Sequence, residues 1–540
     1  MATRTRSGTD PLAAGRAALQ RAAWDEARAI FEAATADGGA AEAWDGLSRA
    51  AWWLGDEETT FAARERAFRA YREVGDVHGA ATMAMWIASD HLDFRGDDAV
   101  SAAWLRRGRE LLEGHEPCAE LGWIMLLECD IAFLAKGDLQ TARSGAEQAL
   151  ALAREVGDVG VEVVALAMLG STMIASGAVE EGLERLAECV SLAVAEEFGD
   201  TAAPGWAYCH TVAACAEVGD FARAEQWCAV LHSWCSTWRA RHFFGVCRTA
   251  YGEVLAARGD WESAEEELLS AMDDLESTRP ALAGPAAVRL GRLRARQGNQ
   301  DEARALFENA LPLPQAALAI GELDLEAGDA TAAVEAAERV LRNLGRASAL
   351  DRFPALELLA RARAATGDAT GARAAVADLA RDADRLATQY MRGRSALVTA
   401  DVLVVAGDHD AARRAAEDAI DLFAASSAPF DAARARLVRA RALAALGRAD
   451  HAEVEAGAAR EALALLGAVP PSKGAGAADL TVREVEILRL VADGLSDSDI
   501  AARLFLSPHT VHRHVANIRT KLRAPSRAAA VAQATRAGLL

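Results

Sequence analysis

The 540-residue sequence lacks a charge-free apolar run of about 18 residues, the length that a bilayer-spanning helix needs. Its first residues, MATRTRSGTD, include two arginines but no apolar stretch after them, whereas a secretory signal has such a stretch. We therefore expect neither a membrane span nor secretion, and we predict a cytoplasmic protein. About half of the residues (52%) are apolar, so the chain can bury a core, and its length predicts several domains or a repeat array.

Sequence patterns of common catalytic sites are also missing. No glycine is followed directly by lysine, which excludes the G-x-x-x-x-G-K-[ST] phosphate-binding loop. The G-x-S-x-G pattern of serine hydrolases does not occur. Before residue 467, nothing alternates between strand and helix periodicity, as a Rossmann or receiver domain requires. We therefore predict that the protein is not an enzyme and binds no cofactor.

Cysteine is scarce, with eight residues between Cys118 and Cys247 and no C-x-x-C pair. In a large chain without a secretory signal, this pattern predicts reduced and buried thiols. The stretch WCAVLHSWCSTWRARHFF, from Trp227 to Phe244, concentrates tryptophan, cysteine and histidine. It could be a metal or redox sensor, but a packed helix is the more frequent explanation of such a stretch. Because its spacing fits no standard metal site, we predict no metal site.

A repeat of about 40 residues fills most of the chain. Its marker is a glycine in eleven copies, and nine of the ten intervals between these glycines are 39 to 42 residues long. The marker glycines are Gly55, Gly96, Gly137, Gly177, Gly219, Gly259, Gly298, Gly328, Gly367, Gly407 and Gly447. Asp follows the glycine in eight copies, and a small residue stands five positions after it. In eight copies that small residue is alanine: Ala142, Ala224, Ala264, Ala303, Ala333, Ala372, Ala412 and Ala452.

Each copy predicts a helix, a tight Gly-Asp turn and a second helix. Glycine readily takes the left-handed conformation that ends a helix, and aspartate is a strong N-cap for the next one. A small residue one turn later lets the two antiparallel helices pack closely. Because one hairpin cannot bury its own apolar stripe, the copies must stack into an α-solenoid. The pattern resembles the tetratricopeptide repeat in a lengthened form, over residues 14–466.

The short interval of 30 residues, from Gly298 to Gly328, contains the sequence LPLP at Leu311 to Pro314. Proline in a helix removes a hydrogen bond and clashes with the preceding turn, so we expect a shortened or broken helix here. We also expect the superhelix to change direction at this point.

All twelve tryptophans lie between Trp24 and Trp261. They could line a concave groove for a small-molecule or protein ligand. Alternatively, they fill the wide spaces between the helices of long repeats. We favour the second explanation, because Trp52, Trp53, Trp86 and Trp123 stand in otherwise apolar helices.

The sign of the charge reverses near the C-terminus. The chain carries a net charge of −21, but residues 500–540 contain seven lysines and arginines and no acidic residue, which leaves −28 for the rest. A small basic unit on a large acidic body indicates that only the tail approaches a polyanion.

Residues 467–479 are rich in proline, glycine and alanine and lack a helical period, so we predict a flexible linker there. Four short helices should follow in residues 480–540. Gly494 should end the first helix, and Ser496 with Asp499 forms an S-x-x-D capping box for the second. Ser507 and Pro508 give an N-cap and first-turn proline for the third, and Ser526 begins the fourth.

The third of these helices, residues 508–522, carries one narrow apolar stripe of Val511, Val515, Ile518 and Leu522. Polar and basic side chains, without any acid, cover the rest of its surface. Such a surface fits the DNA major groove, where Arg reads guanine and Asn reads adenine. It could also be a solvated basic face of an ordinary helix.

A set of residues in the tail follows a known order and spacing: Leu480, Thr481, Arg483, Glu484, Glu486, Gly494, Ser496, Ile500, Ala501, Ser507, Thr510, Val511, His514, Ile518, Lys521 and Leu522. Through these residues the tail resembles the helix-turn-helix domain of LuxR/GerE-type bacterial transcription regulators. The resemblance implies that the helix from Pro508 enters the major groove, that the preceding helix braces the backbone and that the last helix helps to pair two domains. Ser498 and His512 replace basic residues common in the family, and Asp499 replaces the usual Glu, so phosphate anchoring should be weaker or should depend on His512 protonation.

The sequence therefore predicts an all-α fold: a disordered N-terminus (1–13), a tetratricopeptide-like α-solenoid (14–466), a flexible linker (467–479) and a helix-turn-helix DNA-binding domain (480–540). We predict a transcription regulator that binds double-stranded DNA as a homodimer and is associated with the bacterial nucleoid when bound. We favour an activator, with a repressor as the alternative. A small-molecule or protein ligand in the repeat groove would be its signal. The predicted DNA-binding residues are Ser507, Thr510, His512, Arg513, Ala516, Asn517, Arg519, Thr520, Lys521 and Arg523. The alternative is a protein–protein scaffold whose tail is a remnant that does not bind DNA.

Overall fold

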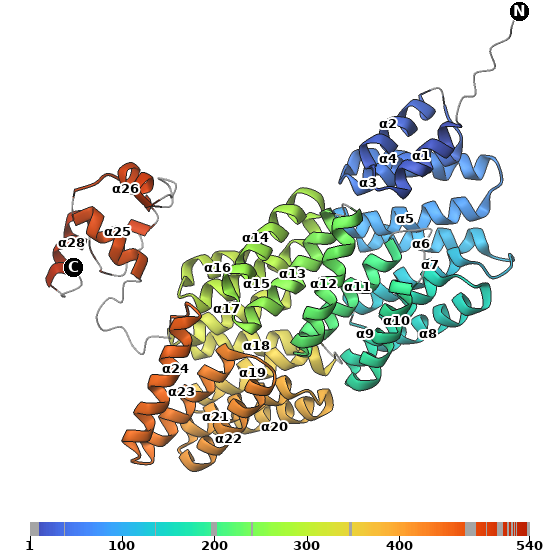
Figure 1. Ribbon diagram of the computed structural model, residues 1–540. Helices are drawn as coiled ribbons and strands as arrows, with labels where there is room; N and C mark the ends of the chain where they lie inside the picture. The colour runs from blue at the N-terminus through green and yellow to red at the C-terminus, as the bar shows by residue number, and fades with distance from the viewer. Residues whose placement is uncertain are drawn as a thin grey trace, which may run out of the picture. The chain divides into compact units, whose positions relative to one another are not determined.

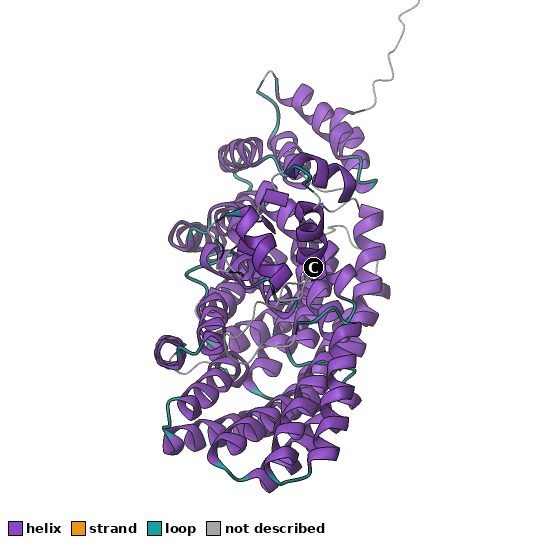
Figure 2. Cartoon of the chain, turned by 90° about the vertical axis from the view of Figure 1, so that its left-hand side faces the viewer, coloured by secondary structure: helices purple, strands orange, loops and turns teal. Residues whose placement is uncertain are grey.

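Helices and short turns are the elements of the computed structural model, and none of the residues that it describes forms a strand (Figures 1 and 2). These residues are 10–36, 38–135, 137–195, 202–238, 241–344, 348–469, 482–492, 494–504, 511, 512, 514, 515, 518, 519, 522, 524 and 526–536. The chain consists of two compact units, Met1–Pro470 and Pro471–Leu540. The fold is therefore all-α, as the sequence predicts.

The first unit is an array of helical hairpins, each formed by consecutive helices that lie antiparallel (Figure 1). Its helices are α1 (Pro11–Gln20), α2 (Trp24–Thr35), α3 (Ala41–Trp53), α4 (Glu57–Glu73), α5 (Val77–Arg95), α6 (Asp98–Leu112), α7 (Ala119–Asp130), the π-helix η1 (Ile131–Ala135), α8 (Leu139–Val156), α9 (Val159–Ser176), α10 (Val179–Ala195), α11 (Ala202–Glu217), α12 (Phe221–Trp238), α13 (Arg241–Arg258), α14 (Trp261–Thr278), the 3-10 helix η2 (Pro280–Leu282), α15 (Gly284–Arg296), α16 (Gln300–Asn309), α17 (Pro314–Ala327), α18 (Ala330–Leu344), α19 (Ala349–Ala365), α20 (Ala369–Leu386), α21 (Gln389–Ala406), α22 (His409–Ala425), α23 (Pro429–Ala445) and α24 (Ala449–Leu465). This is the tetratricopeptide-like α-solenoid predicted from the 40-residue period.

The turn of each hairpin forms as the Gly-Asp signal predicts. All eleven marker glycines have positive φ, between +62° and +95°. In all eight Gly-Asp copies, the aspartate Oδ1 accepts a hydrogen bond from the backbone N–H three residues later, at 2.9 to 3.2 Å. The same signal also ends α4 at Gly75 and α8 at Gly157, where it joins one repeat to the next.

The proline-containing segment shortens a helix, as predicted. Helix α16 has only 10 residues, and α17 begins with Pro314 in its first turn. Farther along the chain, α19 contacts α9 and α23 contacts α13, so the later repeats pack against the middle of the array.

Turns of the middle repeats form part of these long-range contacts. The hydroxyl of Thr388 donates a 2.7 Å hydrogen bond to the carbonyl oxygen of Val218, at the end of α11. A Cβ on the neighbouring Gly219 would lie 2.3 Å from the ring of Tyr390, and Gly219 also has φ +75°. Glycine is therefore required at this turn both for its backbone conformation and for the approach of α21.

The twelve tryptophans fill the interior of the array. Trp24, Trp52, Trp53 and Trp261 are buried, and the other eight are partly buried against hydrophobic clusters: Trp44, Trp86, Trp104, Trp123, Trp206, Trp227, Trp234 and Trp238. The explanation that tryptophan fills wide inter-helix spaces is therefore the one the structure supports.

The cysteines are largely as expected, with one correction. Five of the six free thiols are buried, and Cys118 is partly exposed. Cys209 and Cys247, however, form a disulfide between α11 and α13, so the prediction of reduced thiols is wrong for this pair. These residues lie 38 positions apart, about one repeat, and their Cα atoms are 5.6 Å apart on neighbouring helices, a separation that a disulfide can span.

The stretch that begins at Trp227 forms helix α12 and continues into α13. Cys228 and Cys235 are buried and His232 is exposed, and none of these three belongs to a group of three potential ligands within 4.8 Å of one another. The side chain of His242, the second histidine of this stretch, lies outside the described part of the structure. The described side chains of this stretch therefore form no metal-binding group.

Helix α9 (Val159–Ser176) is long and apolar enough to cross a membrane by length and composition, and 78% of its apolar window is buried inside the protein. Fourteen of its residues are buried, on all sides of the helix. A helix that is apolar all round is expected in the core of a large array.

A buried cluster of charges connects α4 and α5 to the end of α14. Arg64 and Asp90 are both almost fully buried, and Arg64 Nη1 lies 3.1 Å from Asp90 Oδ2. Arg279, at the end of α14, lies 4.0 Å from Asp93 and packs its guanidinium 3.7 Å above the ring of Phe94. The cluster therefore joins segments nearly 200 residues apart in the sequence.

Burial raises the pKa of Asp90 to about 7, even though the nearby Arg64 and Arg279 act to lower it. Because this value lies above the ordinary 3.8, the protonated carboxyl contributes stability that is complete below about pH 4 and is lost as the pH rises through about 7.

We predict that Arg64→Met lowers the free energy of unfolding at pH 8 by about 3–5 kcal/mol, because it leaves the Asp90 carboxylate buried without its partner. The loss should be smaller at pH 5, where Asp90 can take up a proton. Urea unfolding at the two pH values measures both effects. Arg69→Met, on the exposed side of the same helix, should change the stability by less than about 1 kcal/mol. Equal stability of Arg64→Met and the unchanged protein at pH 8 would contradict the account.

Candidate nucleic-acid interface

The C-terminal unit contains the helices α25 (Val482–Ala492), α26 (Asp497–Leu504) and α28 (Arg527–Arg536). Gly494 has φ +85°, and its N–H bonds the carbonyl oxygen of Val491 at 3.1 Å. The N–H of Leu495 bonds Leu490 O at 3.2 Å. Gly494 thus provides the predicted left-handed residue after the first helix, and the chain turns directly into the second.

The start of α26 is the capping box predicted from Ser496 and Asp499. The backbone N–H of Asp499 donates to Ser496 Oγ at 3.2 Å, while the N–H and hydroxyl of Ser496 donate to Asp499 Oδ2 at 3.1 and 2.6 Å. These hydrogen bonds to the carboxylate lower the pKa of Asp499. Aspartate therefore replaces the usual glutamate of this box without loss of the reciprocal bonds.

The third helical segment packs its predicted apolar stripe against the hydrophobic core of the C-terminal unit. Of residues 511–519, all those that the structure describes are helical. Val511, Ile518 and Leu522 are buried, and Val515 packs against the same hydrophobic cluster. That cluster also holds Ile487, Leu488, Leu490, Val491, Ile500, Ala501, Ala524, Ala530 and Ala534 from the other parts of the unit. One core therefore fixes the rotation of this helix about its axis.

Two of the ten predicted DNA-binding residues are described. His512 is 77% exposed, and Arg519 is also exposed. At 100° per residue, both positions lie on one flank of the buried stripe, roughly 80–100° from Val511. The other eight, Ser507, Thr510, Arg513, Ala516, Asn517, Thr520, Lys521 and Arg523, lie outside the described residues.

His512 has a partner within the unit that the sequence did not reveal. Its Nδ1 lies 3.3 Å from Asp497 Oδ2, at the first residue of α26. Arg527, at the first residue of α28, also donates to Asp497 and donates a 2.6 Å bond to Leu495 O. Asp497 thus connects three helical segments, and His512 is held beside a carboxylate at the edge of the exposed surface. No sequence pattern pairs these residues, because their contact depends on the tertiary packing of the unit.

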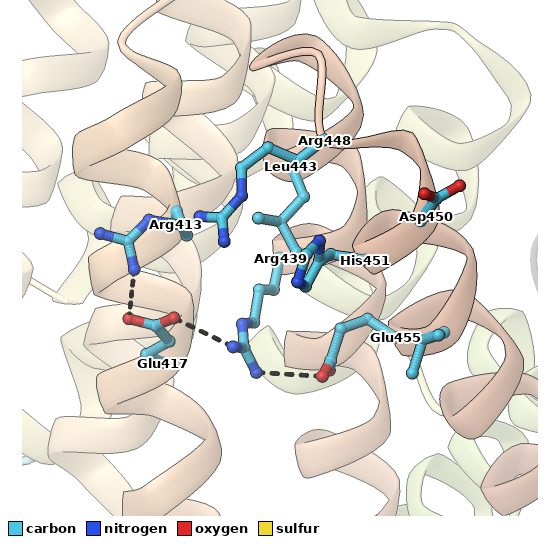
Figure 3. A pocket seen from close by; sticks show the side chains of 9 residues that line it. Arg413, Glu417, Arg439, Leu443, Arg448, Asp450, His451 and Glu455 are labelled. Carbon is cyan, nitrogen blue, oxygen red and sulfur yellow. Dashed lines mark hydrogen bonds and ion pairs between the residues drawn. The ribbon is translucent and has the colours of Figure 1, made fainter.

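In the array, a second candidate site is a surface hollow of about 320 Å³ between α22, α23 and α24. Its side chains form a series of alternating charges, in which Arg413 pairs with Glu417, Glu417 with Arg439, and Arg439 with Glu455 (Figure 3). Leu443, Arg448, Asp450, His451 and Val454 complete the lining. Because the central charges already neutralise one another, this hollow carries no specific indication of a ligand.

The capping box gives a direct test of the local structure. Ser496→Ala removes the hydroxyl that donates to the Asp499 carboxylate and accepts from the Asp499 backbone N–H. We expect this change to destabilise α26 by about 1 kcal/mol. Hydrogen–deuterium exchange of the α26 amides measures this change. Ser498→Ala, an exposed serine two residues later, should leave exchange in α26 nearly unaltered. Equal exchange in the two variants would show that the box does not stabilise the helix.

Comparisons with known proteins agree with this geometry. Residues 478–534 match the family model of bacterial regulatory proteins of the luxR family, GerE. The HTH-type transcriptional regulator Rv0890c of Mycobacterium tuberculosis is 47% identical over 68 residues, which are 13% of this chain and 8% of that protein. The nitrate/nitrite response regulator protein homolog of Haemophilus influenzae is 51% identical over 51 residues, 9% of this chain and 24% of that protein. The chain therefore spans less than a third of the length of these relatives.

Solved structures match the array with low similarity. The apo form of the quorum sensor NprR from B. thuringiensis has a TM-score of 0.40 at 12% identity, covering 63% of this chain and 97% of that one. A Rap protein complexed with competence and sporulation factor has a TM-score of 0.40 at 12% identity, covering 72% of this chain and 98% of that one. We draw no functional conclusion from similarities of this size. The C-terminal unit of the chain is a helix-turn-helix domain of the luxR (GerE) family, joined to a tetratricopeptide-like helical-repeat array.

Proposed function

We propose that the protein is a non-catalytic transcription regulator that binds operator DNA with the helix of residues 508–522 in the major groove. The observation that carries the proposal is the orientation of this helix. Val511, Ile518 and Leu522 are buried in the core of the unit, while His512 and Arg519 are exposed. A helical period continued through residues 508–522 would put residues 513, 516, 517 and 520 on the side opposite the core.

The roles of these residues follow from their chemistry. Arg513 and Asn517 carry side chains that make bidentate bonds to guanine and adenine edges, and Thr510, Ala516 and Thr520 are small enough for the helix to approach the bases. Arg519, Lys521 and Arg523 are assigned to phosphates, and Ser507 is assigned as the N-cap of the helix, next to the DNA backbone. His512, held beside Asp497, is assigned to the edge of the interface rather than to its centre.

The charge distribution supports the same assignment. Residues 500–540 carry seven basic and no acidic residues, whereas the rest of the chain has a net charge of −28. DNA would therefore attract the C-terminal unit and be repelled by much of the array. Two copies of the chain would read half-sites about 34 Å apart, one turn of the double helix, with α28 as the surface through which the domains pair.

The array is proposed as the part that receives a signal. Stacked helical hairpins present an extended surface to partners, and its curvature depends on small rotations between neighbouring repeats. A small-molecule or protein ligand that stabilises one arrangement of the repeats would change how the C-terminal units pair, and we expect this to activate transcription. Because bacterial DNA lies in the cytoplasm, we expect a cytoplasmic protein that associates with the nucleoid when it binds DNA.

A selection from random duplexes with the full chain tests DNA binding and returns the site. We expect a motif with two related half-sites, and an affinity for it that falls steeply with salt as counterions are released. Lys521→Ala should lower the slope of log affinity against log salt by about one unit. Failure to enrich any duplex would favour the alternative, a repeat scaffold whose tail does not bind DNA.

Base readout is tested separately with Arg513→Ala. On the selected site, this variant should lose about 1–3 kcal/mol of binding free energy and relax the sequence preference at one position of each half-site. Fluorescence anisotropy with the selected duplex and single-base variants measures both. Arg106→Ala, an exposed arginine of α6 in the array, is the matched control and should bind as the unchanged protein does. An unaltered affinity of Arg513→Ala would remove this residue from the readout.

A further inference from the structure

Three metal-ligating side chains come together where α5 and α7 begin, and a fourth lies nearby. His78 is the second residue of α5, Cys118 is the N-cap of α7, and Glu120 is the second residue of α7. One potential ligand atom from each of these three residues lies within 4.8 Å of the other two. His115 stands just before α7, and its ring centroid lies 6.1 Å from that of His78. The group therefore comprises one imidazole, one thiol and one carboxylate, and the imidazole of His115 lies beside it.

The existing contacts hold this cluster partly assembled. His78 Nδ1 lies 3.1 Å from Glu120 Oε2, across the interface between two neighbouring repeats. The side chains of His78 and Glu120 are 47% and 27% exposed, and Cys118 is partly buried. Water and ions can therefore reach the ligand atoms, while the two helices fix the backbone positions from which the side chains extend.

We propose that this cluster binds a divalent transition-metal ion, with Zn²⁺ as the best match. Imidazole, thiolate and carboxylate are the three ligand types that proteins use for zinc, at about 2.0–2.3 Å from the ion. Calcium and magnesium are held by oxygen ligands, which this cluster does not supply in number. His78, Cys118 and Glu120 would provide three ligands of a tetrahedral site, and His115, whose ring centroid lies 6.1 Å from that of His78, is the candidate for the fourth.

Binding would draw the ligand atoms together, from separations of up to 4.8 Å to those of one coordination sphere. Because His78 belongs to one repeat and Cys118 and Glu120 to the next, the ion would cross-link α5 and α7. It would thereby fix the rotation between two neighbouring repeats, which sets the local curvature of a solenoid. This inference concerns the array alone and does not depend on DNA binding.

The sequence predicts no metal site, because the repeat architecture separates the ligands along the chain. His115, Cys118 and Glu120 are close in sequence, but His78 lies about one repeat earlier. A short motif with standard zinc spacing is therefore absent, and only the stacking of α5 against α7 brings the ligands together.

The test uses the full chain, stripped of metal with a chelator that is then removed. Titration with Co²⁺ should give the ultraviolet absorption of a cobalt–thiolate bond, and Zn²⁺ should displace the cobalt at one ion per chain. In Cys118→Ser the thiolate band should be lost. Zn²⁺ affinity, measured by competition with a coloured chelator, should fall at least about tenfold in both Cys118→Ser and His78→Ala. A loss of about tenfold already follows from removing a residue that only hydrogen-bonds a metal ligand, so losing the ligand itself should cost at least as much.

The matched control is His451→Ala, an exposed histidine at the start of α24 outside the cluster. It should bind both ions as the unchanged protein does, and circular dichroism should show the same helix content for all variants. Unchanged Zn²⁺ affinity in His78→Ala and Cys118→Ser, or the absence of Zn²⁺ binding by the unchanged protein, would overturn the proposal.

Discussion

The array depends on the close approach of two helices just after each turn. The position five residues after the marker glycine is buried in all eleven copies, as Thr60, Ser101, Ala142, Gly182, Ala224, Ala264, Ala303, Ala333, Ala372, Ala412 and Ala452. At Gly182 a Cβ would lie 2.7 Å from the backbone oxygen of Gly170, so even alanine would force the helices apart there. A larger residue at any of these positions would widen one hairpin and shift every repeat packed after it. The small residue therefore sets the spacing on which the stacking of the whole array depends.

Features repeated along the chain could be predicted from the sequence because their causes are local. The Gly-Asp turn needs only a left-handed residue and an N-cap, and all eight aspartates make the expected bond. Contacts between distant segments could not be predicted in this way. The disulfide between Cys209 and Cys247, the approach of Tyr390 to Gly219 and the convergence of His78 with Cys118 all arise from how repeats stack. Residues 467–469 are another contact that the sequence does not reveal. Their composition predicts a linker, yet the backbone N–H of Val469 donates to the carbonyl oxygen of Arg296 in the array.

The C-terminal unit combines both kinds of feature. Its capping box and its apolar stripe were visible in the sequence, and the packing of Val511, Ile518 and Leu522 confirms the stripe. The contact of His512 and Arg527 with Asp497 was not visible, because it joins three segments whose relative positions only the fold determines. The contact places His512 at the edge of the proposed readout surface. The buried stripe thus fixes which side of the helix faces the core, and Asp497 determines how one flank of the helix is arranged.

Hydrogen–deuterium exchange of the full chain, with and without a selected duplex, tests the central claim most directly. DNA should slow exchange in residues 508–523 and at the start of α26, while exchange in the helical-repeat array should stay the same. Slower exchange confined to the array, with no change in residues 508–523, would contradict the assignment of this helix as the surface that enters the major groove.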